Sequence, residues 1–233
     1  MLAGPNGSGK SFLVPLLQTE VNLGTSVNAD EIEAIISGQP SAKLLNLHNW
    51  NVSLTDEDLR RFAERPDSQR LPQELLAQLR IEQNVLLLGE ARLDSYLAAW
   101  IAELLRVYLL LDKKPLTFET VMSHSSKLDF LREAQQIGYR TYLYFVATAD
   151  PLININRVRA RVSKGGHAVA ENKIVDRYHR SLKLLRPALK FSDRAYIFDN
   201  SGDEPHLIAE VTNGREVAYQ TTEVPAWVQN ILG

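Results

Sequence analysis

The sequence contains no cysteine, and it has only two methionines and three tryptophans among its 233 residues. The lack of cysteine excludes disulfides, thiol catalysis and cysteine-ligated zinc, and it is typical of a reducing compartment. No uncharged apolar run approaches the roughly 18 residues needed to span a bilayer. The chain also shows no internal repeat, and we expect no signal peptide ahead of its first glycines. We therefore expect a cytoplasmic protein without a membrane partner.

The composition is otherwise ordinary for a soluble globular protein, with 45 % apolar and 23 % charged residues. The length predicts a single domain over residues 1–233 that carries a sizeable insertion. The net charge of −2 argues against a molecule that binds polyanions over its whole surface.

The first distinctive motif is GPNGSGKS, which runs from Gly4 to Ser11. Its spacing matches a phosphate-binding loop, in which glycines turn several backbone N–H groups into one concavity at the start of a helix. Lys10 is expected to reach the β- and γ-phosphates, and Ser11 is expected to hold Mg²⁺. The residues expected to contact the nucleotide are Pro5, Asn6, Gly7, Ser8, Gly9, Lys10 and Ser11. Only residues 1–3 precede the loop, where a strand of five or six is usual, so we expect the natural chain to start further upstream.

Short apolar runs then alternate with helical patterns, which predicts an α/β fold with a parallel sheet flanked by helices, as in P-loop kinases. The Asn213-Gly214 pair predicts a C-terminal hairpin. The expected strands are residues 24–29, 116–122, 140–148 and 194–199.

Residues 40–112 break this alternation and predict a helical insertion. Thr55 and Asp58 suit a capping box, and Pro72 opens a long helical pattern with one apolar face. That face consists of Leu93, Leu97, Ile101, Leu104, Tyr108 and Leu111. We expect the insertion to lie beside the acceptor site; a helical layer with no substrate role is the alternative.

Two carboxylates stand where strands are expected to end. Asp30 suits a general base for an acceptor hydroxyl, although it could instead cap the next helix together with Glu33. An ionised Glu119 inside a two-sided parallel sheet would be costly unless it faces the ligand crevice. Asp150 suits a plain N-cap better than a second metal ligand.

The segment from Arg157 to Arg194 holds eleven lysines or arginines against three acids, a net charge of +8. It predicts two arginine-bearing helices joined by glycines, a lid over 151–190 that clamps phosphate oxygens. A solvated basic surface is the alternative. The histidines show no metal-ligand spacing, and His167 beside the glycines is more typical of a loop residue than of a catalyst.

With these motifs together, the chain resembles the zeta-toxin-like P-loop kinases, and in particular their predicted-ATPase branch. The motifs that carry the resemblance are AGPNGSGKS, NADEI, FET and NRVRARVSKGGHAVAENKIVDRYHRSL, which occur in the family's order. The last of these is far more specific than the phosphate loop alone.

The resemblance implies roles for single residues. Asp30 matches the base that activates a hydroxyl, and Glu119 matches an acidic residue that helps to bind acceptor or metal. Arg157 and Arg161 match lid arginines that bind the γ-phosphate. Less secure candidates for substrate contacts are Asn28, Arg177 and Arg180.

The toxins of this family phosphorylate UDP-N-acetylglucosamine and are held inactive by a small antitoxin, so a nucleotide-sugar acceptor and an antitoxin partner are implied. The sequence departs from the family's pattern in two places, so the identity of the acceptor is left undecided. No arginine follows Asp30 closely, and the 40–112 insertion has no counterpart in the family. The sequence therefore predicts an ATP- and Mg²⁺-dependent kinase of a small acceptor. The alternatives are a nucleotide-hydrolysing regulator with a protein partner and a nucleic-acid end kinase. The glycine joint of the basic segment and its lack of aromatic interleaving disfavour the latter.

Overall fold

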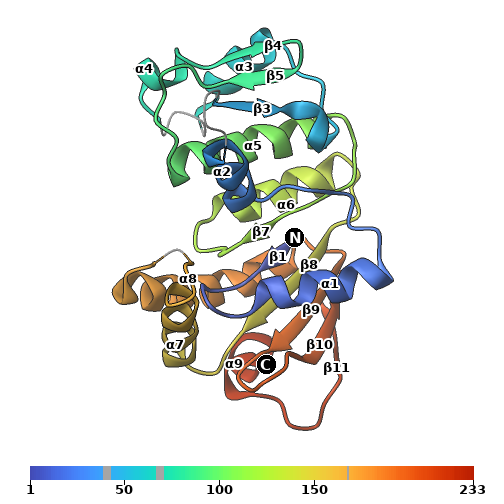
Figure 1. Cartoon of the computed structure of the whole chain (residues 1–233). Coiled ribbons are helices and arrows are strands. Elements are labelled where there is room, and N and C mark those ends of the chain that lie inside the picture. Colours follow the sequence, from blue (N-terminus) through green and yellow to red (C-terminus); the bar gives the residue numbers. More distant parts are fainter. Residues whose placement is uncertain (39–42, 67–70, 167) are drawn as a thin grey trace. The chain divides into compact units, whose positions relative to one another are not determined.

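The computed structural model describes residues 1–38, 43–66, 71–166 and 168–233. These residues form two compact units, one of Met1–Asn22 with Glu119–Gly233 and the other of Leu23–Phe118 (Figure 1). The second unit begins earlier than residue 40 because β2 (Thr25–Ser26) pairs with β6 (Leu116–Thr117), and α2 (Ala29–Ser37) packs on α5 (Ser95–Leu111).

The first unit is built on a six-stranded sheet in the order β11-β10-β9-β8-β1-β7. Strands β7, β1, β8 and β9 are parallel, while β10 and β11 are antiparallel. The strands are β1 (Leu2–Ala3), β7 (Glu119–Thr120), β8 (Tyr142–Ala147), β9 (Arg194–Asp199), β10 (His206–Thr212) and β11 (Glu216–Tyr219). The helices are α1 (Lys10–Glu20), α6 (Ser126–Gln136), α7 (Pro151–Val162), α8 (Glu171–Leu189) and α9 (Ala226–Leu232).

Strand alternation places helices on both faces of this sheet. On one face, Leu13 of α1 packs on Leu2, Tyr144 and Val146, and Figure 1 shows α1 lying across the strands there. Phe145 points the other way, and its ring lies 6.3 Å from that of Trp227 in α9. Helix α8 also contacts β8 and packs on α6 and α9. A mostly parallel sheet with two helical layers confirms the predicted fold class.

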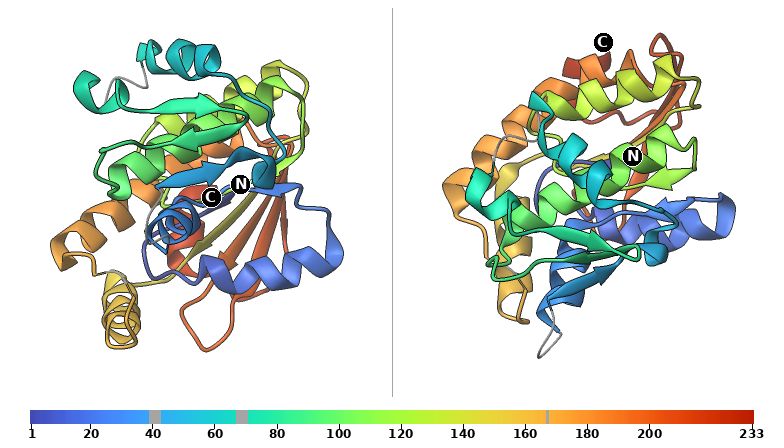
Figure 2. Two further views of the ribbon diagram at one scale, coloured as in Figure 1. Left: turned by 45° about the horizontal axis from the view of Figure 1, so that its top comes forward. Right: turned by 90° about the horizontal axis from the view of Figure 1, so that it is seen from above.

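The predicted C-terminal hairpin is confirmed. Strands β10 and β11 pair around Asn213 and Gly214, which have φ angles of 51° and 66°. Figure 2 shows this hairpin continuing the sheet beyond β9. Strands 142–147 and 194–199 also fall where they were predicted.

Two expected strands are shorter than predicted. The run 24–29 yields only β2, because Asn28 already caps α2. The run 116–122 is divided at Phe118 into β6 and β7, and Met122 has a φ of 50°, which is outside the strand region.

The second unit contains a three-stranded antiparallel sheet in addition to helices. Its strands are β3 (Leu44–Asn46), β4 (Arg80–Glu82) and β5 (Val85–Leu87), in the order β3-β5-β4. Its remaining elements are a 3₁₀ helix, η1 (Leu47–Trp50), and the helices α3 (Asp56–Ala63) and α4 (Gln73–Leu76). The prediction of a long helix running on from Pro72 is wrong over residues 80–87. The chain turns there at Gln83 and Asn84, which have φ angles of 48° and 60°.

The predicted apolar face of 93–111 belongs to α5, the central helix of this unit. Leu97, Ile101 and Leu104 are fully buried. Leu93 lies before the helix, which Asp94 caps, and Leu111 at its other end is 58 % exposed. The predicted capping box of Thr55 and Asp58 is present at the start of α3.

Candidate functional site

The glycine-rich loop of residues 4–9 joins β1 to α1, the strand–loop–helix context that a phosphate loop needs. Gly4, Gly7 and Gly9 have φ angles of 147°, 74° and 93°, which other residues rarely adopt. Gly9 is the N-cap of α1 and provides no side chain to cap the helix. The start of α1 therefore carries no side-chain cap, and its helix dipole favours an anion there.

Lys10 and Ser11 extend from the first turn of α1 toward two different parts of the site. The Lys10 ammonium lies over the loop and donates hydrogen bonds to the carbonyls of Gly4 (2.8 Å) and Pro5 (3.0 Å). The Ser11 hydroxyl donates to a carboxylate oxygen of Glu119 at 3.1 Å. The structure thus brings together two residues that are 108 positions apart and that the sequence singled out independently.

A hydroxyl and a carboxylate are oxygen ligands of the kind that Mg²⁺ prefers. The described residues include no group of three or more His, Cys, Asp or Glu side chains that could hold a metal by themselves. Mg²⁺ usually takes one or two protein ligands and completes its shell with phosphate oxygens and water. Ser11 and Glu119 are therefore suited to Mg²⁺ carried by a nucleotide.

Two buried asparagines support the loop from behind, and sequence reasoning did not identify either of them. Asn154 of α7 donates to the Asn6 carbonyl at 2.6 Å, and Asn200, just after β9, donates to the Ser8 carbonyl at 2.8 Å. Because these carbonyls turn back toward the protein, the loop's opposite side is left for a ligand. The only available signal was that Asn200 directly follows a strand in the pattern FDN.

A further layer of hydrogen bonds orients Asn154. The Thr148 hydroxyl donates to the Asn154 side-chain carbonyl, and the Tyr178 hydroxyl donates to the Thr148 backbone carbonyl at 2.7 Å. Burial, aided by the nearby charges of Asp150 and Asp199, raises the pKa of Tyr178 to about 12. The hydroxyl therefore keeps its proton at neutral pH, and the network holds the loop without ionised groups.

The close packing behind the loop predicts a large effect of a single methyl group. A Cβ on Gly7 would lie 2.6 Å from the Asn154 carbonyl oxygen. We expect Gly7→Ala to lower the free energy of unfolding by about 2–5 kcal/mol, from backbone strain and overpacking together, and to weaken ATP binding. Urea unfolding and calorimetric titration with ATP measure the two effects.

Gly138→Ala is the matched control for this prediction. Gly138 has a φ of 93°, yet its Cβ would meet nothing within 4 Å. The free energy of unfolding of this variant should fall by only the roughly 1–2 kcal/mol that backbone strain costs. Its affinity for ATP should not change. Equal effects of the two variants would show that the loop is not tightly packed.

The basic segment forms α7 and α8, and Asp150 is the N-cap of α7, as predicted. Arg157 donates to the backbone carbonyls of Asn200 (2.8 Å) and Gly202 (2.7 Å). It therefore ties α7 to the segment that supports the loop.

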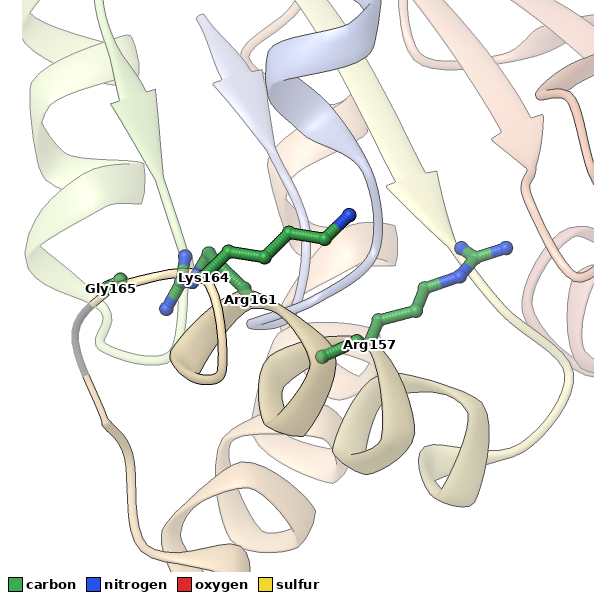
Figure 3. Close-up of a pocket in the computed structure, with 6 residues that line it drawn as sticks. Arg157, Arg161, Lys164 and Gly165 are labelled. Carbon is green, nitrogen blue, oxygen red and sulfur yellow. The ribbon is translucent and has the colours of Figure 1, made fainter.

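Arg161 and Lys164 line a hollow of about 560 Å³ at the end of α7 with Arg157 and the glycines 165 and 166. Figure 3 shows Arg157 and Arg161 extending to opposite sides, with the Lys164 ammonium between them. Lys164 is a cation of this hollow that sequence reasoning did not propose. The three cations give the hollow a positive charge that suits phosphate oxygens.

The two predicted arginines of α8 have different surroundings. Arg177 approaches the loop and donates to the Asn6 side chain at 3.4 Å. Arg180 forms an ion pair with Asp176 at 2.6 Å and is half exposed. The structure therefore brings Arg177 to the loop but does not bring Arg180 there. His167 lies outside the described residues.

Asn28 and Asp30 follow β2 in the second unit. The side chain of Asn28 accepts a hydrogen bond from the Asp30 backbone N–H at 2.9 Å, so Asn28 is the N-cap of α2. The expectation that Asp30 itself could cap this helix with Glu33 is wrong, because the helix begins at Ala29. The Asp30 side chain is exposed and is not needed for the cap.

Comparison with known proteins shows that the fold is shared. A chain from the PezAT chromosomal toxin–antitoxin system of Streptococcus pneumoniae superimposes with a TM-score of 0.52 and 14 % identity, over 99 % of this chain and 76 % of that one. The crystal structure of AvrRxo1-ORF1:-ORF2 with ATP gives a TM-score of 0.51 and 10 % identity, over 99 % of this chain and 62 % of that one. The fold implied by the resemblance to zeta-toxin-like kinases is therefore confirmed.

The sequence match covers a smaller part of the chain than the structural matches do. An uncharacterized protein of Haemophilus influenzae is 32 % identical over 60 residues, which are 26 % of this chain and 43 % of that protein. The match thus spans less than half the length of this relative. No protein-family model matches the chain. No helix of the described residues is long and apolar enough to cross a membrane.

Proposed function

We propose that this protein is a kinase that transfers the γ-phosphoryl group of ATP to a hydroxyl of a small acceptor. The observation that carries the proposal is the loop of residues 4–9. Its three glycines have positive φ angles, Lys10 lies over its carbonyls, and the Ser11 hydroxyl faces Glu119. A turn rich in glycine, serine and asparagine without phosphate chemistry would not need a lysine and a hydroxyl–carboxylate pair at its end.

Each of the site residues in the first unit then has a defined role in phosphoryl transfer. The N–H groups at the start of α1 bind phosphate oxygens, Lys10 neutralises their charge, and Ser11 and Glu119 hold Mg²⁺. Bound Mg²⁺ would neutralise charge on the β- and γ-phosphate oxygens. Arg161 at the end of α7 and Lys164 just after this helix would close on the γ-phosphate, and Arg177 would approach from the side of the loop. For Arg157 to join them, its two carbonyl bonds would have to be exchanged for phosphate contacts.

Asp30 is the proposed general base of the second unit, a role that comes from the resemblance. The acceptor hydroxyl oxygen bonds to the γ-phosphorus while the bond from that phosphorus to the β–γ bridging oxygen breaks. The hydroxyl proton passes to the Asp30 carboxylate, and ADP leaves. The exposed Asp30 side chain supports this role, because a base must be accessible to its substrate.

The direct test incubates the protein with γ-labelled ATP and a metabolite extract, with UDP-N-acetylglucosamine as the first purified acceptor. We expect a labelled product and ADP in equal amounts. ADP that forms at the same rate without any acceptor would instead support a nucleotide-hydrolysing regulator.

The proposed lid predicts that Arg161→Ala impairs chemistry more than binding. A cation that clamps the γ-phosphate interacts more strongly as charge shifts in the transition state. We expect kcat to fall roughly 10²-fold, at the lower end for loss of one preorganised donor, with a smaller change in the Kd for ATP. Steady-state kinetics and calorimetric titration separate the two effects.

Arg159→Ala is the control on the same helix. Arg159 forms an exposed ion pair with Glu171 and carries the same charge, and such pairs contribute little to stability. If both variants turn over normally, the basic segment is a solvated surface without a role in catalysis.

The two solved structures also support a protein partner. One comes from a toxin–antitoxin system and the other from a complex of two chains, AvrRxo1-ORF1 and AvrRxo1-ORF2. We therefore propose that an antitoxin-like protein regulates this kinase.

A further inference from the structure

Two consecutive glycines follow helix α7, and the structure gives them different roles. Gly165 has a φ of 88°, a left-handed conformation that favours glycine. Its N–H donates to the Val162 carbonyl at 2.9 Å, and the N–H of Gly166 donates to the Arg161 carbonyl at 3.0 Å. These two bonds form a Schellman motif, which commonly ends a helix at a glycine. The end of the helix therefore explains Gly165.

Helix α6 ends in the same motif with a different residue in the second position. Gly138 has a φ of 93°, and its N–H donates to the Gln135 carbonyl at 3.1 Å. The next residue, Tyr139, donates to the Ala134 carbonyl at 2.9 Å, as Gly166 does to Arg161 in the motif of α7. The motif thus accepts a side chain at this position, and the φ of Gly166 lies outside the left-handed region. The backbone alone does not explain a glycine at 166.

The side chain of Arg161 occupies the space that a side chain at 166 would need. A Cβ on Gly166 would lie 2.7 Å from the Cγ atom of Arg161, 3.2 Å from its Cδ atom and 3.0 Å from its carbonyl oxygen. The carbonyl is held by the helix end, so the arginine stem would have to move. Because Cγ lies near the base of the side chain, a change of rotamer there redirects the whole guanidinium.

The direction of this stem matters because of what lies beyond it. Arg161 is an exposed cation that lines the hollow of about 560 Å³, and Figure 3 shows it extending away from Arg157. An exposed arginine has many rotamers, and it loses side-chain entropy when a ligand fixes one of them. Packing the stem against a backbone removes some of those rotamers in advance, and preorganised charges stabilise a transition state best.

We propose that Gly166 is a positioning residue for Arg161. Its lack of a side chain selects the direction in which the arginine stem leaves α7, and so presents the guanidinium to the γ-phosphate. The proposal rests on the proposed function and deepens it, because it adds a residue that acts on the chemistry without touching the nucleotide. Gly165 ends the helix, and Gly166 orients the cation.

Gly166→Ala should lower kcat roughly tenfold or more, up to the effect of Arg161→Ala, with an unchanged Kd for ADP. The melting temperature should stay the same, because the displaced stem of the exposed Arg161 can turn into solvent. In the Arg161→Ala background, Gly166→Ala should have no further effect on kcat, since the residue through which Gly166 acts is gone. Steady-state kinetics of the wild type, both single variants and the double variant measure this coupling.

Gly138→Ala is the control that separates loss of stability from loss of orientation. It places a Cβ on the left-handed glycine of the same motif in α6, where the Cβ meets nothing within 4 Å. Its melting temperature should fall because of backbone strain, while its kcat should equal that of the wild type.

Side-chain NMR of the full chain follows the arginine without any turnover. The Nε–Hε resonance of Arg161 is recorded with Mg²⁺ and ADP, and then with Mg²⁺ and a non-hydrolysable ATP analogue. We expect the wild-type resonance to differ between the two, because only the analogue carries a γ-phosphate. Gly166→Ala should lose most of this difference, and Gly138→Ala should keep it.

Three results would overturn the proposal. The first is a Gly166→Ala variant with wild-type kcat and a wild-type NMR response. The second is an equal loss of kcat from Gly166→Ala with and without Arg161. The third is a wild-type Arg161 resonance that does not distinguish the analogue from ADP, because the arginine then does not meet the γ-phosphate.

The two measurements also separate this proposal from the proposed function. If Gly166→Ala loses the NMR response but no acceptor is ever labelled, the proposed kinase activity fails and the positioning role stands. If a labelled product forms and Gly166→Ala makes it at the wild-type rate, the kinase activity stands and the positioning role fails.

Discussion

A Lys10→Ala variant should lose nearly all phosphoryl transfer, with kcat/KM reduced roughly 10³-fold, as for the loss of a preorganised charged donor. The ammonium of Lys10 is placed over the loop by its bonds to the carbonyls of Gly4 and Pro5. It is the only charged group among residues 4–11. Alanine removes that charge and both bonds without adding bulk. Coupled measurement of ADP release and titration with ATP report turnover and affinity.

The variant is expected to remain folded. Two hydrogen bonds from a partly buried lysine contribute about 1–3 kcal/mol together, which a domain of this size can lose without unfolding. Lys183→Ala, an exposed lysine of α8 in the same unit, is the control for loss of one positive charge. If Lys10→Ala has wild-type turnover and a normal circular dichroism spectrum, this loop is not part of the active site.

Asp30→Asn should preserve ATP binding and reduce phosphoryl transfer by roughly 10²- to 10⁴-fold, the contribution of a general base. Asparagine keeps the size and polarity of the side chain but cannot accept the hydroxyl proton. Because Asn28 caps α2, the change leaves the helix start intact. Single-turnover kinetics with the acceptor identified in the labelling experiment measure the chemical step.

Glu31→Gln provides a matched control for this variant. Both acids lie in the first turn of α2, and both are exposed. Each substitution therefore removes a similar interaction with the helix dipole, about 0.3–1 kcal/mol. If the two variants turn over equally fast, Asp30 has only this electrostatic role.

Local patterns in the sequence were enough to predict the elements that local chemistry determines. The loop from Gly4 to Ser11, the cap at Asp150 and the hairpin at Asn213-Gly214 each depend on a few neighbouring residues. Strands β8 and β9 were found because continuous apolar runs are typical of a parallel sheet covered on both faces.

The hairpin of residues 80–87 shows why other elements were missed. Its turn consists of Gln83 and Asn84 rather than a glycine pair, so no standard turn signal was present. The turn is stabilised instead by distant contacts: the Asn84 side chain donates to the Val52 carbonyl and accepts from the Leu54 N–H, both at 2.8 Å. Contacts of this kind are invisible in the local pattern of residues.

The same limit applied to the site. Asn154 and Asn200 contact the loop across 148 and 192 residues of sequence, and asparagines are common enough that nothing distinguishes these two. Tertiary contacts, rather than residue type, give these two residues their importance.

The amide of Asn200 that supports the loop also sets the order in which the nascent protein matures. Strand β1 has no partner until residues 119–120 and 144–145 have been made. The donor to the Ser8 carbonyl, Asn200, is made about 55 residues later. At about 5–20 residues per second, the ribosome needs roughly 10–40 s to proceed from one end of this hydrogen bond to the other. During the first part of that interval β1 is an unpaired apolar segment, and during all of it the loop lacks the hydrogen bond from Asn200. The loop therefore gains its full support only after Asn200 has left the ribosome.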